Sequence, residues 1–448
     1  MKLKPNRNVF ALLLTLCGEF YALAGDCSTL ENIGERTWHP PGYFANLTID
    51  DPWLKEPYGH LKYEGFLNEM EEANFHTTIA FIPWNYDRCE DKVASLFREH
   101  PDRFSVCVHG NNHDHYEFYK YETTLKDSWP EKPLCEQEED IVQAVARMER
   151  FSELTGIDYD RVMVFPHAIA PAETLGLLKK YGFISTVNAG NIPLGSKLPS
   201  VQTSKHSFEP LLFENFASLD RRSASTVDNS DIEDGLSRGK PLLFYVHHEF
   251  FENGINTFNP IAEMVNAIEP SVQWKSLGYI SRHLYLLKKR ENGDYDVRSF
   301  SKSIELENNH NRDVTYFVQK EETFIPPIKK VTVDGKSYSY KRNDDEITME
   351  VVIPAGESRL IDIEYENDLD IASVDISKDD LRVTILRRLS DFRDMTLATN
   401  VVGRAATHFY YETELYKLGL IKLTVLLFIL LTVTISGGYY VRKHIRRR

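Results

Sequence analysis

The sequence predicts an α/β fold: a distorted (β/α)7 barrel, then a small β-sandwich and a C-terminal transmembrane helix. Between residues 43 and 290, short apolar runs rich in β-branched and aromatic residues alternate with stretches of helical spacing, which indicates a parallel sheet. From about residue 291 the pattern changes to short strands separated by turn signals. Near the C-terminus lies an almost uncharged run that is long enough to cross a bilayer.

The barrel is predicted over residues 25–290. Its expected strands are Tyr43–Ile49, Thr77–Ile82, Phe104–Val108, Val162–Phe165, Phe183–Val187, Leu211–Phe216 and Leu242–Val246. Its expected helices include Leu61–Ala73, Glu90–Arg98, Glu138–Leu154, Pro171–Tyr181 and Trp274–Lys289. Seven strands in a domain of this length favour one closed barrel over two separate sheets.

The second domain, the β-sandwich, is predicted over residues 291–366. Asp334-Gly335 stands between two alternating segments and is a hairpin signature, because the favoured two-residue turn needs positive φ. Strands over Ile347–Ile353 and Arg359–Tyr365 continue the pattern. Residues 367–419 are charged and mixed, and we interpret them as a stalk or linker with partial helix.

Both ends of the chain predict export and anchoring. Residues 1–24 have the basic start, apolar run and small-residue site of a signal peptide, with cleavage after Ala24 or, as the alternative, an uncleaved anchor. Residues 420–441 form the expected transmembrane helix, and the basic tail 442–448 would stay cytoplasmic. The barrel would then lie in the periplasm or outside the cell. In that oxidising compartment its four cysteines could form disulfides, and the sequence leaves their pairing open.

The charge of the chain excludes one class of partner. A formal net charge of −15 would repel the phosphates of a nucleic acid. The dense basic cluster lies in the terminal tail, next to the predicted membrane segment. We therefore expect a membrane contact through one C-terminal helix and no nucleic acid.

Polar residues follow the predicted strands in four places. Asp50-Asp51, His109, Pro166-His167 and His247-His248 each come directly after an apolar run. Because the carboxyl ends of parallel barrel strands meet at one mouth, these side chains are expected to lie together.

Each of these groups has an ordinary interpretation when taken alone. Aspartates often cap a turn or helix, and a histidine at a strand end is often a core residue. His109 and His113, spaced by four on an expected first helical turn, would project to one side. Taken together, a carboxylate and two histidines with open positions are typical of a hydrolytic metal site.

The four motifs resemble those of the NodB-homology polysaccharide deacetylases, over roughly residues 43–286. Thr48-Ile49-Asp50-Asp51-Pro52-Trp53 stands for the family's Thr-Phe-Asp-Asp-Gly, and His109-Gly110-Asn111-Asn112-His113 for His-Ser/Thr-x-x-His. Val164-Phe165-Pro166 with Tyr181-Gly182-Phe183 resembles the third region, and Tyr245-Val246-His247 resembles Leu-x-His.

This resemblance implies specific roles. Asp51, His109 and His113 would hold a divalent metal, with Zn²⁺ the first expectation, Asp50 would be the general base, and His247 the general acid. The candidate substrate-binding residues are Trp53, Trp84, Asn85, Pro166, His167 and His248.

The chain also departs from the family pattern. Glycine after the two aspartates is replaced by Pro52-Trp53, Gly110 replaces the motif hydroxyl, and Val164-Phe165 stand where the family has an arginine. The acidic tryptophan motif is absent after Phe183. Further ionisable residues near strand ends, expected either to bind substrate or to be solvated, are His115, Glu117, Asp220, Arg221 and Glu249.

These features predict an enzyme, a metal-dependent hydrolase that removes N- or O-acyl groups from an envelope or secreted polysaccharide. One alternative is a glycoside hydrolase on a related barrel, which would use two carboxylates from Asp50, Asp51, Glu117 and Glu249 and no metal. A second alternative is a non-catalytic glycan-binding or assembly protein that kept the barrel.

Overall fold

The structure is a computed structural model that describes residues 36–114, 116–120, 130–189, 210–213, 215–378 and 380–405. The predicted signal peptide, transmembrane segment and basic tail all lie outside these residues. Within the described residues, no helix is both long and apolar enough to cross a membrane.

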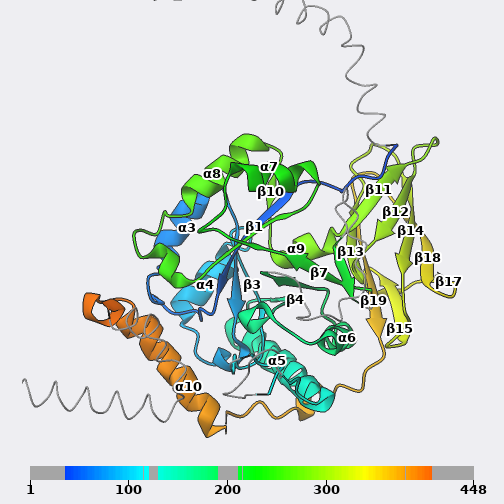
Figure 1. Cartoon of the computed structure of the whole chain (residues 1–448). Coiled ribbons are helices and arrows are strands. Elements are labelled where there is room, and N and C mark those ends of the chain that lie inside the picture. Colours follow the sequence, from blue (N-terminus) through cyan, green and yellow to red (C-terminus); the bar gives the residue numbers. More distant parts are fainter. Residues whose placement is uncertain are drawn as a thin grey trace, which may run out of the picture.

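A ten-stranded, mostly parallel sheet forms the larger part of the molecule (Figure 1). Its strands are β1 (Phe44–Asp50), β2 (Thr77–Phe81), β3 (Phe104–His109), β4 (Asp160–Val164), β5 (Ser185–Asn188), β6 (Leu211–Phe213), β7 (Phe216–Asp220), β8 (Arg222–Ser223), β9 (Leu242–Val246) and β10 (Gln273–Trp274). They follow the order β6-β7-β5-β4-β3-β2-β1-β9-β8, and β10 pairs with β1. Strands such as β1 are buried along their whole length, which explains their unbroken apolar runs.

The α/β class is confirmed, but the prediction of a closed barrel is wrong for the described residues. The strand path has two open ends, β6 and β8, so the sheet is a curled half-barrel. The expected strand Leu211–Phe216 is instead a tight turn: β6 runs antiparallel to β7, and Asn215 adopts a φ of 61° between them. This hairpin occupies the edge at which a parallel ring would have closed.

Helices surround the outside of the curled sheet (Figure 1). They are α3 (Tyr63–Glu72), α4 (Asp91–Glu99), α5 (Leu134–Thr155), α6 (Ala172–Lys180), α7 (Asn229–Ser237), α8 (Asn259–Ile268) and α9 (Leu277–Arg282). The prediction of a single helix over residues 274–289 is wrong beyond Arg282. Residues 285–289 instead form a strand of the β-sandwich. Tyr285 and Leu286 are buried there, so tertiary packing overrides the helical spacing.

Two further sheets pack face to face around a separate apolar core. One contains β11 (Tyr285–Lys289), β12 (Tyr295–Ser299), β14 (Val314–Glu321), β18 (Glu346–Ile353) and β17 (Lys341–Arg342). The other contains β13 (Ser303–Glu307), β19 (Ser358–Tyr365), β15 (Ile328–Val333) and β16 (Lys336–Ser337). Asp334 and Gly335 join β15 to β16 with φ of 49° and 74°, which confirms the predicted hairpin.

The chain then returns to the half-barrel. After β19, a short 3₁₀ turn, η4 (Ile371–Ser373), leads to α10 (Leu381–Phe392) and the π-helical turn η5 (Arg393–Leu397). Hydrogen bonds join this segment to the strand-end loops: Arg88 to Asp391 at 2.7 Å, and His60 to the carbonyl of Ala398 at 2.9 Å. The stretch expected to be a stalk therefore lies, as far as Ala405, beside the mouth of the half-barrel.

Candidate metal centre

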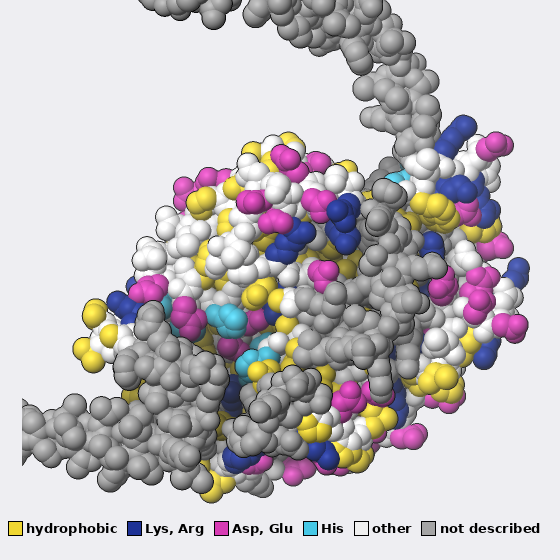
Figure 2. Space-filling model, viewed as in Figure 1, with side chains coloured by type: hydrophobic (Ala, Val, Ile, Leu, Met, Phe, Trp, Pro, Cys, Tyr) yellow, Lys and Arg dark blue, Asp and Glu magenta, His cyan; other side chains and the backbone are white. Residues whose placement is uncertain are grey.

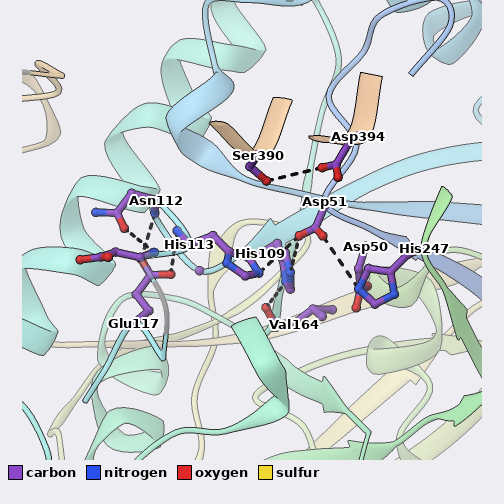
Figure 3. A network of polar contacts seen from close by, with 12 residues as sticks. Asp50, Asp51, His109, Asn112, His113, Glu117, Val164, His247, Ser390 and Asp394 are labelled. Carbon is purple, nitrogen blue, oxygen red and sulfur yellow. Dashed lines mark hydrogen bonds and ion pairs between the residues drawn. The ribbon is translucent and has the colours of Figure 1, made fainter. Parts of the chain in front are cut away.

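Three predicted ligands converge at the carboxyl ends of β1 and β3. Asp51 follows β1, His109 ends β3, and His113 lies in the loop after β3. The Nε2 atoms of His109 and His113 are 3.3 and 3.4 Å from Asp51 Oδ1. Figure 3 shows both imidazoles directed at this carboxylate, and Figure 2 shows histidine and acidic side chains together in a hollow of the face drawn.

The donor atoms of this group fit a small divalent cation. His109 Nδ1 lies 2.8 Å from the carbonyl of Val164, so that nitrogen carries the proton and Nε2 presents its lone pair. Asp51 Oδ1 is buried without a hydrogen-bond partner, although two imidazole nitrogens lie close to it. Zinc bonds of about 2.0–2.1 Å in a tetrahedron place ligands about 3.3–3.4 Å apart, which matches the two separations.

The charges of the centre favour the metal-binding forms of Asp51 and His113, whereas in the absence of a metal they favour the protonated form of His109. Burial alone would raise the pKa of Asp51, but the neighbouring imidazoles hold it well below its usual value. Burial lowers the pKa of His113 well below its usual value, so this ring is neutral. Burial also opposes the charged form of His109, yet the carboxylates of Asp51 and Asp50 outweigh it and raise that pKa. The Asp51 carboxylate, held ionised beside buried imidazoles, therefore attracts a cation.

The loop that carries the two histidines is not the helical turn that the spacing predicted. Gly110 and His113 have φ of 63° and 54°, in the left-handed region. The backbone amides of the loop point inward, and the buried carboxylate of Glu117 accepts from Asn111 at 2.6 Å, Asn112 at 2.9 Å and His113 at 3.2 Å. Burial and the charge of Asp140 raise the pKa of Glu117 to about 7.

Asp50, the predicted general base, is paired with a residue whose role the sequence left open. Arg221, just after β7, donates from both terminal nitrogens to the two carboxylate oxygens of Asp50, at 2.6 Å each. Both side chains are buried, and the guanidinium also lies 4.5 Å from the centre of the Tyr245 ring. Burial opposes ionisation of Asp50, but Arg221 overcomes it and lowers the pKa. The buried positive charge that faces Asp50 therefore comes from Arg221.

The adjacent histidines after β9 differ in environment. His247 Nε2 lies 3.9 Å from Asp51 Oδ2, and half of its side chain is exposed to the open side of the site. His248 is 3% exposed and packs against Gly59, where an added Cβ would lie 2.4 Å from its ring nitrogen. His247 can therefore reach a bound molecule, whereas His248 is a buried residue of the surrounding shell.

The predicted sugar-stacking residues are covered by other side chains. Trp53 is 6% exposed, and the guanidinium of Arg88 lies 4.2 Å from its ring centre. Trp84 is 2% exposed and packs with Val383 of α10, under Lys378. Neither ring presents an open face to a sugar in this structure.

The remaining predicted substrate residues divide in the same way. Asn85 is buried and accepts a hydrogen bond from Arg88 at 2.6 Å. Pro166 is buried against Gly110. His167 is exposed beside His113, with ring centres 5.1 Å apart, and its φ of 55° is a strained value for a non-glycine residue. Only His167 of this group can contact a substrate, while His115 lies outside the described residues.

Residues from the C-terminal segment complete the surroundings, and no sequence pattern indicated them. Arg387 of α10 donates to the carbonyl oxygen of His113 at 3.1 Å. Asp394 of η5 accepts from the Tyr58 hydroxyl at 3.1 Å and lies 3.7 Å from His248. More than 270 residues separate Arg387 from His113, so no spacing rule could have joined them.

A second group of possible ligands, His248, Glu249 and Asp394, lies next to this centre. Asp394 is already paired with the guanidinium of Arg393 and accepts from the hydroxyl of Tyr58. A resident positive charge at the central carboxylate makes this group an ion-pair network rather than a metal site.

Comparisons with known proteins give distant likenesses. No family model and no curated protein matches the chain. A solved family 4 carbohydrate esterase from Streptomyces lividans, in complex with acetate, is 13% identical, with 52% of this chain and 92% of that chain covered and a TM-score of 0.30. A polysaccharide deacetylase from Mycobacterium smegmatis is 13% identical, with 55% and 93% covered and a TM-score of 0.36. A family 4 pseudoenzyme from Bacillus anthracis is 9% identical, with 53% and 64% covered and a TM-score of 0.30.

Proposed function

We propose that this chain is a metal-dependent hydrolase that removes acetyl groups, N- or O-linked, from a polysaccharide. The observation that carries the proposal is the buried oxygen Asp51 Oδ1, which has no hydrogen-bond partner and faces the Nε2 atoms of His109 and His113. A carboxylate oxygen and two imidazole nitrogens at these separations suit a cation bound between them.

Two flanking residues are suited to move protons. The carboxylate of Asp50 is kept ionised by Arg221, so it can accept a proton from a water molecule that attacks the acyl carbon. His247 is half exposed and can deliver a proton to the amine or hydroxyl that leaves as the acyl bond breaks. The products are acetate and a free amine or hydroxyl on the sugar.

The metal, when bound, would polarise the acyl oxygen and make water easier to deprotonate. Zn²⁺ is the first candidate because two imidazoles and one carboxylate suit its ligand preference. The hydrogen bond from His109 Nδ1 to the carbonyl of Val164 would hold the imidazole in the orientation that presents Nε2 to the metal.

The structure offers little support for a glycosidase. Glu117 is buried with its carboxylate bound to three backbone amides, so it is not free to act as a second catalytic carboxylate across a sugar-sized gap from Asp50, as glycoside hydrolysis requires. A non-catalytic glycan-binding protein is disfavoured because both proton-transfer candidates stand beside the intact ligand group.

We further propose that the half-barrel acts outside the cytoplasm, tethered by the apolar segment 420–441. The basic tail after this segment supports that orientation. A tethered enzyme would act on glycans that lie near the membrane.

Acetate release tests the function directly. Purified protein should be stripped with a chelator, reloaded with Zn²⁺, and incubated with oligomers of an N-acetylated amino sugar and with an O-acetylated glycan. We expect zinc-dependent acetate release without new reducing ends, and no release by the Asp50→Asn variant. New reducing ends without acetate would instead indicate a glycosidase.

A further inference from the structure

We propose that Glu117 is a positioning residue of the metal centre that acts through the backbone of the ligand loop, in place of the hydroxyl that the motif lacks. The inference rests on the proposed metal site and goes beyond it, because Glu117 lies outside the ligand and proton-transfer sets.

The carboxylate of Glu117 binds the backbone of the ligand loop through both of its oxygens. Its Oε1 accepts from the amide of Asn111 at 2.6 Å. The same Oε1 accepts from the amide of Asn112 at 2.9 Å, and Oε2 accepts from the amide of His113 at 3.2 Å (Figure 3). Three successive amides thus converge on one side chain that is 1% exposed. A carboxylate with no water around it forms strong hydrogen bonds to such donors.

These bonds maintain a strained backbone at His113. His113 adopts a φ of 54°, a value that costs a non-glycine residue about 1 kcal/mol or more and persists only where the surroundings impose it. Its own amide is one of the three bound by Glu117. The carboxylate therefore holds the peptide that directs the His113 imidazole at Asp51.

The Glu117 carboxylate also lies directly against Gly110. At Gly110 an added Cβ would lie 2.0 Å from Glu117 Oε2 and 2.7 Å from Pro166. The Glu117 carboxylate therefore fills the space where a serine or threonine side chain would stand. Gly110 and Glu117 form a matched pair that replaces the motif's usual residue.

The loop is also fixed through the side chain of Asn111, independently of Glu117. The Asn111 side chain donates to Gln143 at 2.9 Å and accepts from Arg147 at 2.8 Å, both on α5. Removal of the carboxylate should therefore leave the loop attached to α5, while the peptide of His113 loses its constraint.

The test compares Glu117→Gln and Glu117→Ala with a matched control, Glu322→Gln. Glu322 is equally buried, lies directly after β14, accepts from Lys320 at 2.9 Å and Tyr365 at 2.6 Å, and pairs with Lys179 of α6. Glutamine at 117 can keep the two bonds of Oε1, but its amide NH₂ would face the His113 N–H. Each variant is measured for its Zn²⁺ dissociation constant by chelator competition, its melting temperature, and the zinc concentration that gives half-maximal acetate release.

We expect the zinc dissociation constant to rise roughly 10-fold in Glu117→Gln and roughly 100-fold in Glu117→Ala, with a parallel rise in the zinc needed for activity. Glu322→Gln should lower the melting temperature and leave both zinc measurements unchanged. Wild-type zinc affinity in Glu117→Ala, with only a lower melting temperature, would overturn the inference. Failure of the wild type to bind zinc would overturn the proposed function as well.

Discussion

Asp50 and Arg221 face each other through two hydrogen bonds of 2.6 Å, and both side chains are buried. Their parallel bonds fix the direction of the Asp50 carboxylate beside the metal ligands. Because Arg221 lies on a different strand end, the pair also couples β1 to β7 across the sheet.

Replacement of Arg221 by alanine should cost about 3–5 kcal/mol of unfolding free energy, because the buried Asp50 charge loses its partner. The pKa of Asp50 should rise, since Arg221 is what lowers it against burial. The acidic limb of kcat/KM should therefore move to higher pH. Arg221→Lys, which keeps the charge but not the paired bonds, should show an intermediate shift. An unchanged acidic limb in Arg221→Ala would show that Asp50 is not the base.

His247 and His248 are predicted to respond oppositely to alanine substitution. His247 is half exposed, so its loss should change stability by less than about 0.5 kcal/mol, while kcat falls by roughly 10²–10⁴. His248 is buried, so its loss should lower the melting temperature through a cavity. Thermal melts and initial rates of acetate release check both. Full activity in His247→Ala would remove it from the mechanism.

Arg387 tests whether helix α10 supports the metal ligand His113. Its bond to the carbonyl of His113 suggests that Arg387→Ala should weaken zinc binding roughly 10-fold. Arg388 is its exposed neighbour on α10, and Arg388→Ala is the matched control. This control should leave the zinc dissociation constant unchanged. Equal zinc affinity in the two variants would show that α10 only covers the site.

His76 predicts a pH dependence of stability away from the metal centre. Burial lowers its pKa from 6.5 to about 4, and its ring bonds the carbonyl of Asp102 and the hydroxyl of Ser105, each at 2.9 Å. Above pH 6.5 the ring is neutral in both the folded and the unfolded chain, so it adds no pH dependence to the free energy of unfolding. As pH falls from 6.5 to about 4, the unfolded chain binds the proton first, so the free energy of unfolding falls by about 3 kcal/mol.

Urea unfolding of wild type and His76→Gln between pH 7 and 4 measures this contribution as the difference between their pH slopes. The variant should be less stable at pH 7 but lose less stability on acidification. Parallel slopes would exclude His76 as a source of acid sensitivity.

Much of the fold could be predicted because the local signals agree with the packing. The half-barrel strands are buried on both faces, and burial of that kind leaves continuous apolar runs such as β1. The spacing of apolar residues predicted the wrong structure for Tyr285–Lys289. This segment continues the helical spacing of α9, but it forms a strand that pairs with β12 in the sandwich. The open end of the sheet could not be predicted either, because it depends on the hairpin between β6 and β7.

The site divides along similar lines. Asp51, His109, His113 and His247 could be predicted because parallel strands bring their carboxyl ends to one mouth. The functions of Arg221 and Glu117 could not, since their partners are set by sheet order and by a loop conformation. Trp53 and Trp84 were predicted to face a sugar, but the sequence carries no sign that Arg88, Lys378 and α10 would cover them.

The zinc content of the purified protein is the decisive measurement for the proposed metal centre. Wild type and His109→Ala should be reloaded with Zn²⁺, dialysed and analysed by elemental mass spectrometry beside a thermal melt. We expect about one equivalent of zinc in the wild type and almost none in a folded His109→Ala protein. Equal zinc in both proteins, or none in either, would contradict the proposed metal centre.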